Sequence, residues 1–195
     1  MIKKFIIEGL DRLGKSTLTQ SIQDELGHYQ IIHFGKPQKL KYYEKITTSL
    51  EGIRPDESAE INPLFQYQFA SFKNMFELLR SDARIIFDRA HLGECVYSPI
   101  YRNYSGDYVY DLEHKYGMGD NWDARLILLT EDFATAKHFV DDGLSFDVTK
   151  REQEQNLFLQ AFEKSIIRDK RIVCVTDPAH GGFKPKEWIL EEVLA

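Results

Sequence analysis

The sequence predicts an α/β fold with a five-stranded parallel sheet, because short apolar runs alternate along it with longer segments of helical periodicity. The runs are rich in Ile, Val, Leu and Phe, as in strands that helices cover on both faces. The expected strands are residues 4–7, 29–34, 84–87, 125–129 and 171–175. A length of 195 residues suits one core, so we expect residues 1–195 to form a single domain.

Helices are expected where apolar residues recur every three or four positions. The clearest repeat, Phe65, Phe69, Phe72, Phe76 and Leu79, precedes the third strand. Further repeats lie at residues 18–26, 157–162 and 188–193. The segment 97–123 contains three glycines among many tyrosines, and we expect it to be an insertion or a long loop.

Composition and charge exclude several classes of protein. Hydrophobic residues make up 43% and charged residues 29%, as in ordinary globular proteins. The net charge of −6 argues against a large nucleic-acid footprint but not against a small anionic ligand in a basic pocket. No apolar run approaches the roughly 20 residues of a membrane span, and the N-terminus does not resemble a signal peptide. Cys95 and Cys174 are too far apart in sequence for a CxxC metal pair, so we expect reduced thiols and a cytoplasmic protein.

The strongest motif follows the first expected strand and matches G-x-x-x-x-G-K-[ST] in full. Its glycines let the backbone wrap around an anion, and the following helix adds its positive dipole end. Lys15, expected to face solvent on this loop, can reach the β- and γ-phosphates, and the Ser16 hydroxyl can join the Mg²⁺ shell. We therefore predict a three-layer P-loop NTPase fold that binds ATP (or GTP) with Mg²⁺. The donor-binding residues are Gly9, Leu10, Asp11, Arg12, Leu13, Gly14, Lys15, Ser16 and Thr17.

The run from Phe5 to Leu18 resembles the first strand and P-loop of thymidylate kinases, whose pattern is close to E-G-x-D-x-x-G-K-[ST]. A second match is the pair Asp88-Arg89, at the end of the third expected strand. The resemblance implies the five-stranded parallel sheet, a mobile lid and a homodimer. It also implies phosphoryl transfer from ATP to a (deoxy)nucleoside monophosphate, with dTMP or a related pyrimidine nucleotide as the expected acceptor.

The resemblance also assigns roles to residues around the phosphates. Arg89 should contact the acceptor phosphate, and Asp88 should act near Mg²⁺ or anchor a neighbouring group. Asp11 resembles the carboxylate that holds the 3′-hydroxyl of the acceptor, and Arg12 the loop arginine that reaches the transferring phosphate. Lys15, Arg12, Asp11 and Arg89 are thus the expected catalytic residues, with Ser16 and Asp88 as metal ligands. Ligands in parallel α/β sheets bind beyond the carboxyl ends of the strands, where this chain carries Glu8, Asp11, Arg12, His33, Lys36, Asp88 and Arg89.

The acceptor base should meet the phenylalanine-rich helix. By resemblance, Phe65 and Phe69 lie where the family places a ring that stacks on the pyrimidine, and Gln66 or Gln68 would bind its edge. The family more often has an arginine at this place, and this sequence has none there. Lys36 is expected to help hold the acceptor phosphate.

The remaining expectations concern the donor. A lid is expected near residues 137–151, and its middle is acidic rather than rich in arginine. That composition is consistent with the loop arginine, Arg12, providing the electrostatic stabilisation. Asp177 and Pro178, after the fifth strand, should lie beside the adenine.

Two other functions compete with this interpretation. A deoxynucleoside kinase has a similar P-loop and Asp/Glu-Arg motif, but a hydroxyl acceptor needs a carboxylate base. No acid follows the second strand before Glu44, and Asp11 and Asp88 are the carboxylates left to act as the base. A phosphorylated acceptor needs cations instead. The tract after the second strand offers His33 and Lys36, so the sequence favours the monophosphate acceptor. A nucleotide switch is the third class, and it would need a base-reading motif such as N-K-x-D, which is not evident.

Overall fold

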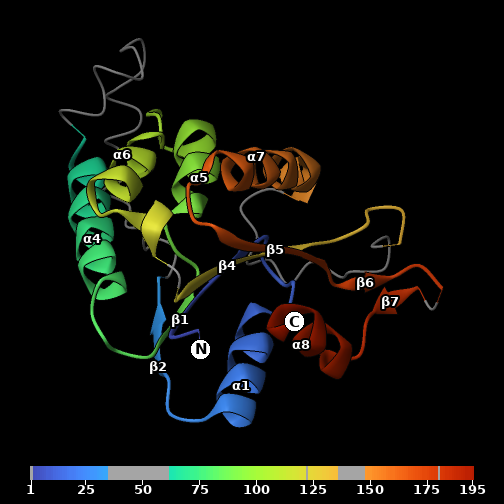
Figure 1. Ribbon diagram of the computed structural model, residues 1–195. Helices are drawn as coiled ribbons and strands as arrows, with labels where there is room; N and C mark the ends of the chain where they lie inside the picture. The colour runs from blue at the N-terminus through green and yellow to red at the C-terminus, as the bar shows by residue number, and fades with distance from the viewer. Residues whose placement is uncertain (1, 35–61, 122, 136–147, 180) are drawn as a thin grey trace.

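A computed structural model describes residues 2–34, 62–121, 123–135, 148–179 and 181–195. Its central sheet has five parallel strands in the order β2-β3-β1-β4-β5, which confirms the predicted fold class (Figure 1). The strands are β1 (Lys4–Gly9), β2 (Gln30–His33), β3 (Ile85–Asp88), β4 (Ala124–Thr130) and β5 (Asp169–Cys174).

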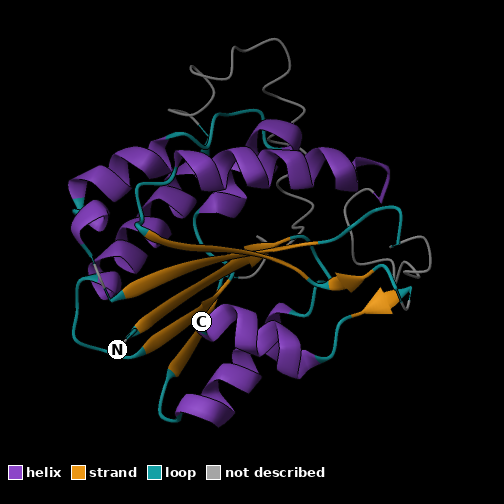
Figure 2. Ribbon diagram, turned by 45° about the vertical axis from the view of Figure 1, so that its right-hand side comes forward, coloured by secondary structure: helices purple, strands orange, loops and turns teal. Residues whose placement is uncertain are grey.

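Helices cover the sheet on both faces, giving three layers (Figure 2). One face carries α1 (Lys15–Leu26) and α8 (Lys186–Leu194). The other carries α4 (Pro63–Leu79), α5 (Leu92–Tyr101), α6 (Tyr108–Lys115) and α7 (Arg151–Lys164). A short hairpin of β6 (Thr176–Asp177) and β7 (Gly182–Phe183) precedes α8. The short helices η1 (Met118–Asp120) and η3 (Val148–Lys150) complete the described elements.

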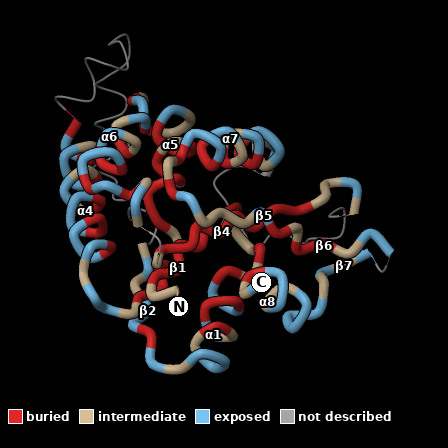
Figure 3. Tube along the Cα trace, in the orientation of Figure 1, coloured by how far each residue is buried: buried red, intermediate tan, exposed pale blue. Residues whose placement is uncertain are grey.

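The core lies in the middle of the sheet. Every residue of β1, β3 and β4 is buried, and α4 and α7 are exposed only on their outer sides (Figure 3). The edge strands differ from the expectation that all five strands are covered, because Ile31 on β2 is 40% exposed and Ile172 on β5 is 46% exposed. An edge strand has a neighbour on one side only, so fewer side chains reach its faces.

The segment 97–123 is not the long loop that the sequence predicted. It contains the second half of α5, all of α6 and η1, and its Tyr104 is completely buried. Gly106 and Gly117 lie between helices, and Gly119 lies within η1, so the glycines that suggested a loop connect or belong to regular elements here. Gly106 allows a close approach, because a Cβ atom there would lie 2.4 Å from the Glu94 carbonyl oxygen. Tyr97, Tyr104 and Tyr116 of this segment are buried core residues, and its other tyrosines are partly buried against the core.

Parallel pairing brings the carboxyl ends of β1, β2 and β3 to one edge of the sheet. Ile7 pairs with Asp88, and His33 pairs with the same residue from the other side. The residues that follow these strands therefore lie close together, as expected of a ligand site in this architecture. Among the described helices, none is long and apolar enough to cross a membrane.

Candidate active site

The phosphate-binding loop connects β1 to α1 as predicted. Gly9 has a φ of 130°, and a Cβ atom there would lie 2.4 Å from the Leu129 carbonyl oxygen on β4. Gly14 precedes α1 in the left-handed conformation, with a φ of 78°. The side chains of Leu10 and Leu13 are buried in the core and anchor the loop from inside. The glycines thus serve a close approach at one end and a helix start at the other.

Lys15 is buried, with 5% exposure, and does not face solvent as the sequence suggested. Its Nζ donates hydrogen bonds to the Gly9 carbonyl oxygen at 2.9 Å and to that of Leu10. Burial, followed by the positive charge of Arg89, lowers the pKa of Lys15 to about 8, although the nearby carboxylates oppose this shift. Its ammonium is therefore held inside the loop, where an anion would stabilise it.

Ser16 and Asp88, the expected metal ligands, are adjacent. The Ser16 hydroxyl donates to Asp88 Oδ2 at 2.7 Å, and His33 Nδ1 lies 3.2 Å from the same oxygen. The other carboxylate oxygen, Oδ1, is buried and makes no hydrogen bond within the described part of the chain. A hydroxyl beside a carboxylate with a free oxygen fits the hard oxygen ligands that Mg²⁺ prefers.

Arg89 follows β3 in a left-handed conformation, with a φ of 67°. Non-glycine residues adopt this conformation rarely, and they concentrate at functional sites. Its Nη2 lies 2.6 Å from Asp11 Oδ1 of the phosphate-binding loop. Its Nε is buried and has no hydrogen-bond acceptor among the described residues, so the guanidinium keeps a donor for a ligand. Arg12 shares the strained conformation, also with a φ of 67°.

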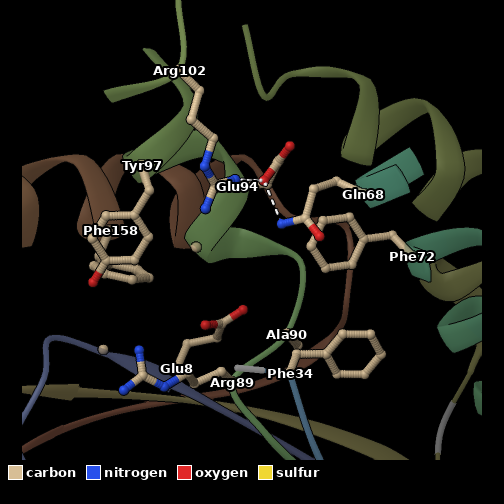
Figure 4. Close-up of a pocket in the computed structure, with 12 residues that line it drawn as sticks. Glu8, Phe34, Gln68, Phe72, Arg89, Ala90, Glu94, Tyr97, Arg102 and Phe158 are labelled. Carbon is tan, nitrogen blue, oxygen red and sulfur yellow. Dashed lines mark hydrogen bonds and ion pairs between the residues drawn. The ribbon is translucent and has the colours of Figure 1, made fainter. Parts of the chain in front are cut away.

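A cavity opens beside Arg89 under helices α4 and α5 (Figure 4). On one side, the rings of Phe34 and Phe72 stack with centroids 5.8 Å apart. On the other, Tyr97 meets Phe158 edge to face at 5.8 Å. Between them lie Glu8, Gly9, Gln68, Arg89, Ala90, Gly93, Glu94 and Arg102. Aromatic walls with a few polar groups are typical of a site for a nucleobase and its sugar.

A buried network of hydrogen bonds forms the far end of this cavity. Glu94 accepts from Arg102 Nη1 at 2.5 Å and from Gln68 Nε2 at 3.3 Å. The hydroxyls of Tyr104 and Tyr108 donate to its other oxygen at 2.6 and 2.9 Å. Burial, followed by the Glu94 charge, raises the pKa of both tyrosines, so their hydroxyls stay protonated and donate. Since a carboxylate only accepts, the amide nitrogen of Gln68 must face Glu94.

The sequence left open whether Gln66 or Gln68 would bind the edge of the base. Gln68 is buried and lines the cavity, whereas Gln66 is exposed. Phe65 and Phe69 stack on each other and contact Tyr108, with centroids 4.9 and 5.6 Å away, and neither lines the cavity. Phe72 takes that place instead. It shares a helix face with Phe65 but lies seven residues, or about 10 Å, further along the axis.

Sequence reasoning placed Glu8 at the ligand-binding edge of the sheet but gave it no role in the site, and its carboxylate points into the cavity (Figure 4). It is 1% exposed, and its Oε1 accepts a hydrogen bond from the Leu92 amide at the start of α5, at 2.8 Å. Burial raises the pKa of Glu8, whereas the charge of His91 and the neighbouring amides oppose this rise. A charged residue at the end of an apolar strand was the signal that could have identified it.

Arg151, the last residue of the expected lid, lies at the start of α7 and contacts the phosphate-binding loop, which sequence reasoning did not predict. Its Nη1 and Nη2 donate to the Asp11 carbonyl oxygen, both at 3.3 Å, while its Nε donates to Glu131 at 3.0 Å. Glu131, at the end of β4, thus holds an arginine against the phosphate-binding loop. Residues 137–147 of the expected lid, and Lys36, lie outside the described residues.

A second cleft, of about 400 Å³, lies on the other side of the phosphate-binding loop. Its lining comes from the loop, α1, β7 and α8: Arg12, Leu13, Gly14, Thr17, Leu18, Ser21, Phe183, Lys184, Lys186 and Ile189. Asp177 and Pro178 do not line it. The hairpin turns the chain after β6, and Asp177 Oδ1 accepts from the Ala179 amide at 2.9 Å, so Phe183 occupies the wall instead.

Several solved structures are similar to this chain in fold. The YorR protein from Bacillus subtilis, in complex with phosphorylated GDP, is 16% identical, with a TM-score of 0.60 over 98% of this chain and 93% of that chain. Deoxyadenosine kinase from M. mycoides, with products dCMP and a flexible dCDP, is 18% identical, with a TM-score of 0.53 over 98% and 96%. Thymidylate kinase from Candida albicans is 18% identical, with a TM-score of 0.53 over 99% and 89%.

A comparison with curated proteins found no match. The family model for thymidylate kinase matches residues 7–179, which span the phosphate-binding loop, Asp88-Arg89 and the cavity residues described above. The chain therefore belongs to the thymidylate kinase family and is a nucleotide kinase.

Proposed function

We propose that this protein transfers the γ-phosphate of ATP to the 5′-phosphate of a deoxynucleoside monophosphate, with dTMP or a related pyrimidine nucleotide as acceptor. The observation that carries the proposal is Arg89. It stands between the phosphate-binding loop and an aromatic cavity, in a strained conformation and with a buried donor that lacks a partner in the described structure. A guanidinium in that position suits a second phosphate group.

On the donor side, the loop amides and Lys15 would hold the β- and γ-phosphates. Ser16 and Asp88 would hold Mg²⁺, which when bound neutralises charge on the phosphates. Arg12 and Arg151 flank the loop from opposite sides and would stabilise charge on the transferring group. The adenine would lie in the cleft beside α1.

On the acceptor side, the two carboxylates have different tasks. Asp11 pairs with Arg89 and would orient the guanidinium toward the acceptor phosphate. Glu8 faces the cavity and would accept a hydrogen bond from a hydroxyl of the acceptor sugar. Asp11 remains the residue that the family resemblance assigns to the 3′-hydroxyl, so Asp11→Asn and Glu8→Gln would separate the two roles.

For the base, Phe34 and Phe72 offer stacking surfaces, and Gln68 and Arg102 offer polar groups. With its amide nitrogen turned to Glu94, Gln68 presents a carbonyl oxygen that can accept from N3–H of thymine or uracil. Arg102 can donate to a ring carbonyl. The family more often has a base-binding arginine on the helix that corresponds to α4. In this chain Arg102, 34 positions after Gln68, would take that role.

The second candidate is a deoxynucleoside kinase, and Glu8 is the observation that favours it. A nucleoside acceptor needs a carboxylate near its 5′-hydroxyl, and a buried carboxylate lines this cavity beside Arg89. ATP consumption measured with a panel of deoxynucleosides and their monophosphates decides between the two. Turnover of deoxynucleosides without turnover of any monophosphate would overturn the proposed function.

Arg89→Lys provides an independent test, because lysine keeps the charge but loses the two-pronged geometry. For a monophosphate acceptor, we expect the acceptor KM to rise roughly 10- to 100-fold, as for the loss of a charged hydrogen bond, and the ATP KM to stay unchanged. Arg84→Lys, near the opposite end of β3, is the matched control and should change neither constant. An effect on kcat alone would indicate that Arg89 meets no phosphate of the acceptor in the ground state.

A further inference from the structure

One buried carboxylate holds both of the polar side chains that are offered to the base. Glu94, on α5, is 2% exposed, and its Oε2 accepts from Arg102 Nη1 at 2.5 Å and from Gln68 Nε2 at 3.3 Å. Gln68 comes from α4, and Arg102 directly follows α5. Because they donate to the same oxygen, these two side chains lie next to each other at the end of the cavity (Figure 4).

Glu94 is itself fixed from its other side. Its Oε1 accepts from the hydroxyls of Tyr104 and Tyr108, at 2.6 and 2.9 Å. Four donors thus surround the two oxygens of this carboxylate, which has room for about four hydrogen bonds. A carboxylate that is occupied in this way holds its neighbours in place and has little capacity left for a ligand.

The contact with Glu94 sets the orientation of the Gln68 amide. A side-chain amide keeps nearly the same shape when it is turned by 180°, so its hydrogen-bond partners decide which end points where. With its nitrogen toward Glu94, Gln68 gains a hydrogen bond to a charged group, whereas the reverse orientation would set two oxygens against each other. Figure 4 shows the amide oxygen of Gln68 on the side away from Glu94. Arg102, which can only donate, lies beside it.

We propose that Glu94 is the positioning residue that sets the base preference of the acceptor site. Gln68 Oε1 accepts from N3–H of thymine or uracil, and Arg102 donates to the adjacent ring carbonyl. In cytosine, N3 is an acceptor and the group beside it is an amine, so both contacts would pair like with like. The proposal rests on the proposed function in one respect, that the cavity binds the base of the acceptor. It goes beyond that function because it names the group that fixes the polarity of the base contact.

The kinetic test compares dUMP with dCMP, whose bases differ only along this edge. We expect the wild type to prefer dUMP roughly 10- to 100-fold in kcat/KM, as for a two-point contact to one base edge. In Glu94→Gln, the new amide can donate as well as accept, so Gln68 can turn round. The preference should then fall about tenfold, the effect of one charged hydrogen bond. Glu94→Asp, which keeps the charge but draws the carboxylate back from Gln68, should lower the preference too and replaces Glu94→Gln if that variant does not fold.

Two controls separate this role from a general disturbance of the fold. Glu154→Gln changes another buried glutamate, which accepts from the Tyr101 hydroxyl at 2.6 Å and is not among the described residues that line the cavity. Its preference for dUMP should equal that of the wild type. In the Gln68→Met background, Glu94→Gln should cause no further change in the preference, because the amide through which Glu94 acts is gone.

The orientation of Gln68 can also be followed by NMR without any acceptor. In ¹H–¹⁵N spectra of the wild type, we expect one side-chain amide proton of Gln68 to be shifted downfield by the Glu94 carboxylate. Gln68→Met assigns the signal, and Glu94→Gln should remove the shift.

An unchanged ratio of dUMP to dCMP turnover in the Glu94 variants would overturn the proposal, as would a wild type that uses both equally. A fall in the ratio that persists in the Gln68→Met background would overturn the route through Gln68. If deoxynucleosides are turned over but no monophosphate is, the proposed function fails. The ratio of deoxyuridine to deoxycytidine turnover then tests Glu94 in the same way.

Discussion

The two halves of the active site are built in different ways. The donor half is a single segment, residues 9–17, held between β1 and α1, next to an open cleft of about 400 Å³. The acceptor half is a narrow cavity whose walls come from β1, α4, α5, α7 and the residues that follow β2 and β3. A continuous loop can be recognised from sequence, whereas a site built from six separate places depends on the fold. The predictions below test this difference, beginning with the largest expected effect.

Lys15→Met should have the largest effect on activity. Methionine keeps a long unbranched side chain in the buried position and removes the charge that follows the transferring phosphate. We expect kcat to fall roughly 10³-fold, about 4 kcal/mol of transition-state stabilisation. Lys4→Met, which removes another buried lysine at the opposite end of β1, should leave kcat unchanged. Comparable losses in both variants would mean that the effect arises from the fold rather than from the phosphate-binding loop.

Glu94→Gln should mainly lower the stability of the fold, because Glu94 accepts every hydrogen bond of the network at the end of the acceptor cavity. Removing its charge leaves the Arg102 guanidinium buried without a counter-charge, and we expect a loss of about 3 kcal/mol in the free energy of unfolding. Urea denaturation followed by circular dichroism measures it. Glu152→Gln, at an exposed position of α7, should leave the denaturation midpoint where it is. Equal midpoints for wild type and Glu94→Gln would show that the network does not stabilise the acceptor half.

Phe183→Ala should have the smallest effect, confined to the donor half. The ring is 46% exposed on the wall of the cleft, where it would contact the adenine. Losing one aromatic contact of about 1 kcal/mol should raise the ATP KM roughly fivefold and leave the acceptor KM unchanged. Trp188→Ala, an exposed aromatic on α8 that does not line the cleft, is the control. If both variants bind ATP like the wild type, the adenine lies elsewhere.

The sequence by itself determined the fold class and the phosphate-binding loop. Apolar runs and helical repeats indicate a parallel sheet with helices on both faces, and G-x-x-x-x-G-K-[ST] encodes a backbone conformation within eight consecutive residues. It also placed Asp88 and Arg89 beside that loop, because parallel strands end at the same edge. One error was local: three glycines suggested a long loop over residues 97–123, where the second half of α5 and all of α6 form.

Only the tertiary structure decided which side chains form the acceptor cavity. Helical periodicity assigns Phe65, Phe69 and Phe72 to one face of α4, but only Phe72 of the three lines the cavity, whereas Phe65 and Phe69 contact Tyr108 of α6. Arg102 and Gln68 meet at the Glu94 carboxylate, and Glu113 reaches His91, across 34 and 22 residues of sequence. No local pattern relates such pairs. They meet because α5 and α6 pack on the sheet. Burial then strengthens the electrostatic interactions between them, which water would screen at the surface.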